Sequence, residues 1–349
     1  MKKIKLAAAL VSFLAILLLL QMLLVPKYMT HAPEGALIGE YYENAGNHDV
    51  IFIGDCEVYE NFSPITLWEE YGITSHIRGS AQQTIWQSYY LLEETFRYET
   101  PRVIIFNVLS MKYDTPESTG SPSRREAYNR MTLDTMKWSS SKWNSILASM
   151  TEAEKQWDSI FTYLFPILRY HDRWSQLTQE DITYWFHRDT VSHNGYLMQT
   201  GVKPFTTAYE EPPLADYSFG DTSWQYLDSM VQLCADHGSK LVLIKAPSLS
   251  PVWWDQWDAQ IEEYAHQNNL LYINMLDHQS QIGIDWNTDT YDAGLHLNVC
   301  GAEKASVWLG KLLAEEFDLP DHRGEACTAA LWSEKTLRYY KQKRSLENE

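Results

Sequence analysis

Four short, unbroken apolar runs are the feature of this chain that most limits how it can fold. Runs without polar alternation are typical of strands that are buried on both faces of a parallel sheet. The runs lie at residues 49–54, 101–109, 240–245 and 270–274, and a weaker fifth lies at 74–77. Helix-like stretches lie between them at 63–71, 83–98, 223–237 and 251–268. Strands that alternate with helices predict an α/β fold with a doubly wound parallel sheet.

The N-terminal segment predicts one transmembrane helix. Residues 6–25 are apolar except for Ser12 and Gln21, and lysines at positions 2, 3 and 5 precede them. At about 1.5 Å per residue, such a helix matches a hydrocarbon core of roughly 30 Å. A cleaved signal peptide is the alternative, but it usually has a shorter apolar region followed by a small-residue cleavage site. We interpret residues 1–28 as an uncleaved signal anchor of the cell membrane, single-pass, with the N-terminus in the cytoplasm and the remainder outside.

The remainder divides into four parts by composition. Residues 29–112 and 222–317 are the two halves of the predicted α/β domain, and 318–349 form a polar extension, either a peripheral helix or a loose tail. Residues 113–221 predict a mostly helical insertion that is rich in aromatic residues, among them Trp138, Trp143, Trp157, Trp174, Trp185, Phe161, Tyr163 and Phe165. These rings can stack on sugars, but we expect them to form the core of the insertion instead.

Charge and cysteine spacing exclude several classes of protein. The chain has 46 acidic and 28 basic side chains, for a net charge of -18, so nucleic acid is not an expected partner. Its four cysteines show no CxxC pair, and histidines and carboxylates have no metal-ligand spacing. A phosphate-binding loop is also absent from the sequence, so we predict no metal and no cofactor.

Two segments carry side chains suited to nucleophilic catalysis. Gly54-Asp55-Cys56 follows the first predicted strand, which places Cys56 at the carboxyl edge of the sheet, where ligands bind in such folds. Asp292 and His296 share one short loop before a predicted helix at 302–315. A thiol, a base and a carboxylate that orients the base are the parts of a catalytic triad. The alternative reading is a buried structural cysteine with a solvated loop histidine.

In their order along the chain, these motifs resemble those of the SGNH (GDSL-like) hydrolase superfamily. The closest resemblance is to its membrane-anchored extracellular branch, which includes DltD-type proteins and glycan O-acyltransferases. The resemblance implies a three-layer, flavodoxin-like α/β fold with Cys56 as nucleophile, His296 as base and Asp292 as its orienting acid. It also implies an oxyanion hole made by Cys56, by Gly79 after the second strand and by Asn107 at the end of the third. The sequence departs from the family because Cys replaces Ser and the Asp-to-His spacing is one residue longer.

The resemblance implies an extracytoplasmic esterase or O-acyltransferase. It would act on a cell-envelope glycan or teichoic-acid-like polymer through an acyl-Cys56 intermediate, with a polytopic membrane acyltransferase as a partner. A catalytically silent protein that binds glycan or acts as a scaffold is the alternative, because of the two departures. A third possibility is a thiol hydrolase whose Cys56 is reversibly oxidised, for instance by pairing with Cys300.

Overall fold

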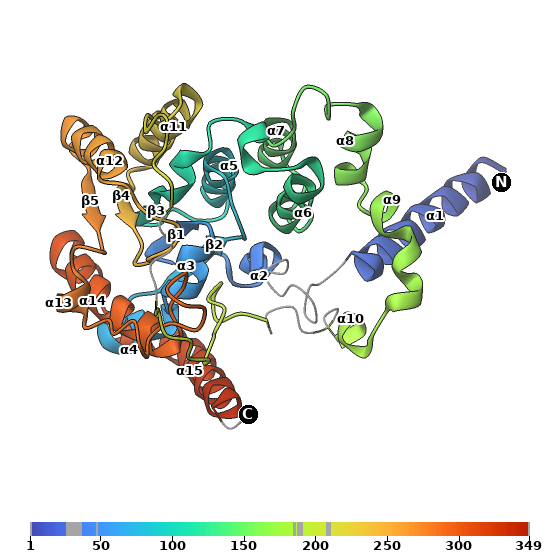
Figure 1. Cartoon of the computed structure of the whole chain (residues 1–349). Coiled ribbons are helices and arrows are strands. Elements are labelled where there is room, and N and C mark those ends of the chain that lie inside the picture. Colours follow the sequence, from blue (N-terminus) through green and yellow to red (C-terminus); the bar gives the residue numbers. More distant parts are fainter. Residues whose placement is uncertain are drawn as a thin grey trace.

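The computed structural model describes residues 2–25, 37–46, 48–183, 186, 191–206 and 211–347. At its centre is a parallel sheet of five strands in the order β2-β1-β3-β4-β5 (Figure 1). The strands are β1 (Val50–Gly54), β2 (Ser75–Gly79), β3 (Val103–Asn107), β4 (Lys240–Lys245) and β5 (Leu271–Asn274). After β1 the chain adds β2 on one side of it, and then adds β3, β4 and β5 on the other side. Ligands bind at such a switch point, here between β1 and β3, in open α/β sheets.

The predicted α/β class and its parallel sheet are confirmed. All five apolar runs form strands, and the weak run near residue 75 becomes the edge strand β2. All four helix-like stretches form helices, namely α4 (Pro64–Tyr71), α5 (Ile85–Thr95), α11 (Asp221–His237) and α12 (Asp255–Asn268). Helix α14 (Val299–Phe317) begins before the predicted residue 302, because the Asn298 side chain accepts hydrogen bonds from two N–H groups of its first turn.

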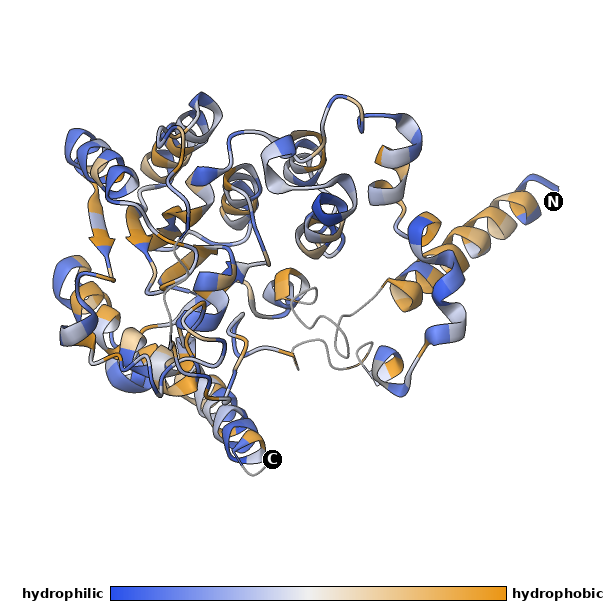
Figure 2. Ribbon diagram, in the orientation of Figure 1, coloured by the Kyte–Doolittle hydropathy of each residue, from blue (hydrophilic) through white to orange (hydrophobic). Residues whose placement is uncertain are grey.

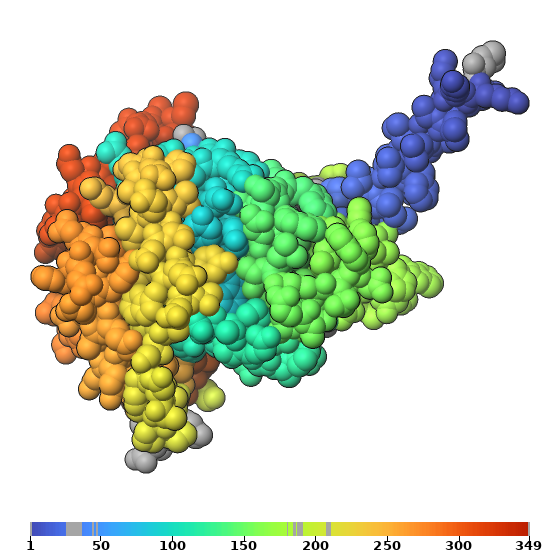
Figure 3. Space-filling view, turned by 90° about the horizontal axis from the view of Figure 1, so that it is seen from above, coloured from blue at the N-terminus to red at the C-terminus, as the bar shows by residue number. Residues whose placement is uncertain are grey.

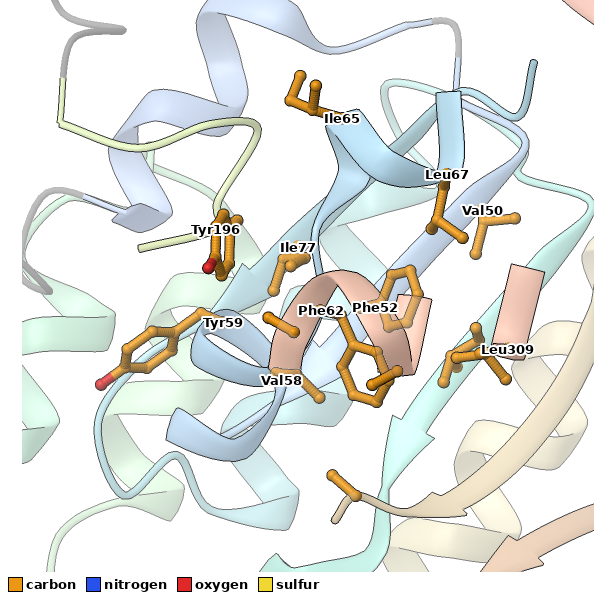
Figure 4. Packing of buried hydrophobic residues seen from close by; sticks show 14 of the residues in the cluster. Val50, Phe52, Val58, Tyr59, Phe62, Ile65, Leu67, Ile77, Tyr196 and Leu309 are labelled. Atoms are coloured by element: carbon orange, nitrogen blue, oxygen red, sulfur yellow. The ribbon is translucent and has the colours of Figure 1, made fainter. Parts of the chain in front are cut away.

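Helices cover both faces of the sheet, which explains why its strands show no polar alternation. Val50 and Phe52 of β1 pack into one buried cluster, whereas Ile51 and Ile53 pack into another on the opposite face. The first cluster includes residues of α3 (Cys56–Asn61), α4 and α14, and the second includes residues of α5, α11 and α12. Figure 4 shows part of the first cluster, in which Phe62 stacks on Phe52 with ring centroids 5.2 Å apart.

The predicted insertion is helical in its first part only. It contains η3 (Pro116–Thr119), α6 (Pro122–Leu133), α7 (Ser140–Ala148), α8 (Trp157–Leu164), α9 (Ile167–Tyr170), η4 (His171–Gln176) and α10 (Gln179–Thr183), after η2 (Val108–Lys112). Residues 191–198 return to the α/β layer without forming a helix. There the Ile77 N–H donates to Asn194 at 2.9 Å, and Tyr196 is fully buried in the first core cluster.

Five of the eight aromatic side chains named above are exposed, so the expectation that they form the core of the insertion is wrong for these five. Trp138, Trp157 and Trp174 are 56, 65 and 70% exposed, and Phe161 and Phe165 are 41 and 45% exposed. Of the eight, Tyr163 is buried in the hydrophobic cluster of the insertion, and Trp143 packs against that cluster. Trp185 lies outside the described residues.

Helix α1 (Lys2–Leu24) projects away from the rest of the molecule and is long and apolar enough to cross a membrane (Figures 1, 2 and 3). Only its C-terminal end approaches the body, where it contacts α9 and η4 of the insertion. The next described element, α2 (Leu37–Asn44), packs against β2. The structure therefore shows a candidate membrane span that is attached to the body at one end.

The polar C-terminal extension is a docked helix rather than a loose tail. After α13 (Gln279–Ile282) and η5 (His322–Gly324), helix α15 (Ala326–Leu346) lies against α4. Its Trp332 stacks on Trp68 with ring centroids 5.1 Å apart, and its Tyr339 is fully buried. The extension therefore contributes Trp332 and Tyr339 to the first core cluster, which also contains residues of α3 and α4.

Candidate active site

Cys56 lies at the switch point of the sheet, as the first residue of α3 and two residues after the end of β1. Asp55 caps this helix, since its carboxylate accepts a hydrogen bond from the Glu57 N–H at 3.2 Å. Because Cys56 is the first helical residue, its own N–H has no acceptor within the helix. The Cys56 side chain is half-buried and packs partly against the first core cluster.

Gly79 allows α3 to lie directly on the ends of the strands. It is paired with Gly54 across β1 and β2. A Cβ atom at position 79 would lie 3.1 Å from a methyl carbon of Val58 and 3.2 Å from the carbonyl oxygen of Gly54. Both separations are shorter than ordinary van der Waals contact, so only glycine fits without displacement of the helix. Gly79 thus lies under the helix that carries Cys56, and its N–H remains a predicted oxyanion donor.

The loop that carries Asp292 and His296 is fixed to the far end of α3. The Leu297 N–H donates to the Asn61 side-chain oxygen at 2.8 Å, and the Tyr291 hydroxyl donates to Glu60 at 2.8 Å. Glu60 and Asn61 follow Cys56 by about one turn of the same helix. These two bonds bring a loop from the C-terminal part of the chain to the cysteine.

His296 is oriented by Asp292 as the sequence predicted. Its Nδ1 lies 2.7 Å from Asp292 Oδ2, and its backbone N–H donates to the other oxygen of that carboxylate at 2.8 Å. The ring is 6% exposed, and its buried Nε2 has no hydrogen-bond partner among the described residues. Cys56 and His296 lie close enough for each to shift the pKa of the other. The structure therefore brings Cys56, His296 and Asp292 together.

A second carboxylate, which sequence analysis missed, lies against the same imidazole nitrogen. Glu60 Oε2 is 2.9 Å from His296 Nδ1, and the Glu60 side chain is almost fully buried. Burial disfavours a charged imidazole, but the Cys56 sulfur, Asp292 and Glu60 outweigh it and raise the pKa of His296 well above its usual range. The available signal was the position of Glu60 one turn after Cys56, on the same side of the helix.

The surroundings of Cys56 favour the protonated thiol. Burial, with a further contribution from the Asp55 carboxylate, raises the pKa of Cys56 to about 11 although His296 opposes the change. The surroundings of the pair therefore favour a protonated thiol and a protonated imidazole. One proton must leave this pair before a thiolate can form, and the pair titrates as a unit.

Asn107 lies near the site, but its side-chain amide is engaged elsewhere. Its Nδ2 donates to Asp55 at 3.1 Å and to Glu57 at 2.9 Å, and its Oδ1 accepts the Ala246 N–H at 3.0 Å. Both amide hydrogens therefore point at carboxylates beneath α3. The geometry does not support the predicted oxyanion role of Asn107, and gives it a structural role at the end of β3.

A buried ionic cluster, also missed by sequence analysis, lies under α3. Lys245, at the end of β4, donates to both oxygens of Glu57 at 3.0 Å, and Ser248 donates to the same carboxylate. The Lys245 and Glu57 side chains are 0 and 1% exposed. Burial and the nearby Glu57 raise the pKa of Asp55 to about 6. A lysine at the end of an apolar run was the signal, because such a residue needs a buried partner.

Other site chemistry is limited. Among the described residues, no group of three His, Cys, Asp or Glu side chains is placed to hold a metal ion. Cys56, Cys234, Cys300 and Cys327 are all free thiols. The site thus consists of a cysteine, a histidine and two carboxylates at the carboxyl edge of a parallel sheet.

Comparisons with known proteins add no further identification. No protein-family model matches this chain, and no curated protein matches it in sequence. The fold and the geometry of the site are therefore the basis on which a function can be assigned.

Proposed function

We propose that this protein is an SGNH-like esterase or O-acyltransferase that works outside the cytoplasm on acyl groups of a cell-envelope glycopolymer. The observation that carries the proposal is the meeting of Cys56 with His296, whose Nδ1 is bound by Asp292 and whose buried Nε2 has no hydrogen-bond partner in the described part of the chain. These groups come from distant segments of the chain and lie at the switch point of the sheet. The strand order also agrees with the three-layer, flavodoxin-like fold that the resemblance implies.

The proposed reaction starts from the Cys56–His296 pair after it has lost one proton. The sulfur attacks the acyl carbonyl carbon, and the thiol proton passes to His296 Nε2. His296 then returns that proton to the leaving alkoxide, which departs as an alcohol and leaves a thioester on Cys56. A water or acceptor hydroxyl attacks the thioester, gives its proton to His296 and restores the thiol. In this scheme the N–H groups of Cys56 and Gly79 stabilise the oxyanion, and Asn107 has no part in it.

The proposed location follows from α1. A helix that spans the membrane with its lysines in the cytoplasm would place the catalytic body on the outer side, where envelope polymers are found. A polytopic acyltransferase that supplies the acyl group is part of the proposal through the family resemblance alone.

The test uses the purified full chain in detergent with a small acyl ester. We expect Cys56→Ala to abolish turnover and Cys300→Ala, which removes an exposed thiol elsewhere, to retain it. Mass spectrometry of the intact chain should detect an acyl adduct on the wild-type protein and on C300A, but not on C56A. Equal turnover by C56A and the wild type would contradict the nucleophile assignment.

A second candidate is a catalytically silent glycan-binding or scaffold protein. It is favoured by the high pKa of the Cys56 thiol, about 11, and by the engagement of both amide hydrogens of Asn107. The pH dependence of Cys56 alkylation separates the two candidates. A thiol that stays inert up to pH 8 supports the scaffold, whereas reactivity that rises below pH 8 supports catalysis.

A further inference from the structure

We propose that an exposed aromatic face of the insertion lies in the outer interface of the bilayer beside α1. This face, called here the aromatic face, consists of apolar side chains that are 41 to 70% exposed: Trp138, Trp157, Phe161, Phe165, Leu168 and Trp174. The inference requires α1 to span the membrane, as proposed above, and does not depend on the chemistry of Cys56.

The aromatic face is largely continuous. Trp157 and Phe161 have ring centroids 5.8 Å apart, Phe161 and Phe165 are 6.3 Å apart, and Trp138 and Phe165 are 6.4 Å apart. These rings therefore form a chain of contacts from α8 and the residue after it to the segment just before α7, and the exposed Leu168 and Trp174 lie on the next elements, α9 and η4. Contiguous exposed apolar surface of this kind marks a binding site for a membrane or for a partner.

The position of α1 identifies the membrane as the occupant. In the last two turns of α1, the side chains of Leu17, Gln21, Leu23 and Leu24 are less exposed than the rest of the helix, and these turns approach α9 and η4. Arg173 of η4 donates to the Leu24 carbonyl at 3.3 Å. The elements that carry part of the aromatic face therefore contact the end of the candidate membrane span itself.

The length of α1 places this contact at the outer boundary of the bilayer. Its 23 residues are about 34 Å long, and a hydrocarbon core is roughly 30 Å thick. The stretch from Leu17 to Leu24 covers about the last 10 Å of the helix. Side chains that pack on it lie at the depth where tryptophan and other aromatic rings are enriched, between the acyl chains and the headgroups.

Charge selects the kind of lipid surface. With a net charge of -18, the chain as a whole is repelled by anionic headgroups. We therefore infer that the aromatic face enters the membrane through its rings, and that zwitterionic lipid is sufficient for this interaction.

The test reconstitutes the full chain in nanodiscs of phosphatidylcholine, with and without phosphatidylcholine brominated near the headgroup end of its acyl chains. Trp157→Phe and Trp174→Phe remove one fluorophore each and keep an apolar ring. The matched control is Trp224→Phe on α11, at the end of the body away from α1 (Figure 1). We expect brominated lipid to quench the fluorescence assigned to Trp157 and Trp174 about twofold or more, and that of Trp224 not at all.

Two results would overturn the inference while leaving the anchor in place. One is co-elution of the chain with the discs, but with Trp157 and Trp174 quenched no more than Trp224. The other is protection of Trp157 and Trp174 from aqueous acrylamide only after a soluble glycan is added, which would make the aromatic face a glycan surface. A chain that fails to co-elute with the discs would overturn the anchor and this inference together.

Discussion

Replacement of Glu60 by glutamine tests the electrostatic description of the site most directly. Glu60→Gln preserves the shape of the side chain and an oxygen that can accept the Tyr291 hydroxyl, but removes one of the two negative charges beside His296 Nδ1. The remaining carboxylate of Asp292 still orients the ring at 2.7 Å. The change therefore alters the charge of the site with little alteration of its geometry.

The expected effect is a shift of Cys56 reactivity to lower pH. Glu60 raises the pKa of both His296 and Cys56. Its neutralisation therefore favours loss of the first proton from the pair, whether that proton leaves the imidazole or the thiol. An opposite charge within about 4–6 Å moves a pKa by roughly 1–3 units, and each unit corresponds to about 1.4 kcal/mol. Since Glu60 Oε2 lies 2.9 Å from the ring, we expect the midpoint of the pH profile to fall by at least about one unit.

The assay is the rate of Cys56 alkylation by a small electrophile as a function of pH, with labelling at Cys56 quantified by peptide mass spectrometry. Glu262→Gln, on the exposed face of α12, makes the same change in net charge away from the site and should leave the profile unchanged. A Glu60→Gln profile that coincides with the wild type, or that moves to higher pH, would refute the coupling of Glu60 to the pair.

Three further outcomes are expected. Asp292→Asn should lower ester turnover by roughly 10⁴-fold at unchanged stability, because the amide cannot hold the ring nitrogen in the same protonation state; turnover within tenfold of the wild type would exclude Asp292 as the orienting acid. Lys245→Met should lower the free energy of unfolding by about 3–5 kcal/mol in urea titrations, since it leaves Glu57 buried and unpaired, and adding Glu57→Gln should recover part of this loss. Glu99, whose pKa is lowered by His48 and Tyr41 despite its burial, contributes stability above its unfolded pKa of about 4.3 that is lost as the pH falls through its lower folded value. Glu99→Gln should therefore destabilise the protein at pH 7, and the difference from the wild type in thermal unfolding should shrink below about pH 4; a constant difference would contradict this origin.

The sheet could be predicted from sequence because its strands are buried on both faces. Burial on both sides requires unbroken apolar runs, and each run therefore identified a strand regardless of its neighbours in space. The aromatic residues of the insertion could not be placed in this way. The sequence does not distinguish exposed from buried aromatic residues. Trp157 is exposed and Tyr163 is buried because different elements pack against them.

The site was predictable only in part for a similar reason. Cys56, Asp292 and His296 stand out because their residue types and local order suit nucleophilic chemistry. Glu60 follows Cys56 by one helical turn, but its contact with His296 depends on a loop that is distant in sequence, and the helical spacing alone does not reveal that contact. Asn107 fitted a motif position, yet Asp55 and Glu57 beneath α3 take up its amide hydrogens.

The distance along the chain between Cys56 and His296 has a consequence during biosynthesis. At about 5–20 residues per second, the ribosome adds the histidine some tens of seconds after the cysteine. Until α14 and its preceding loop are made, the thiol has neither its imidazole neighbour nor the cover that the loop provides. The nascent chain therefore passes through a period in which oxidants and other thiols can reach Cys56, and protection of this residue depends on synthesis of the segment from Tyr291 to Phe317.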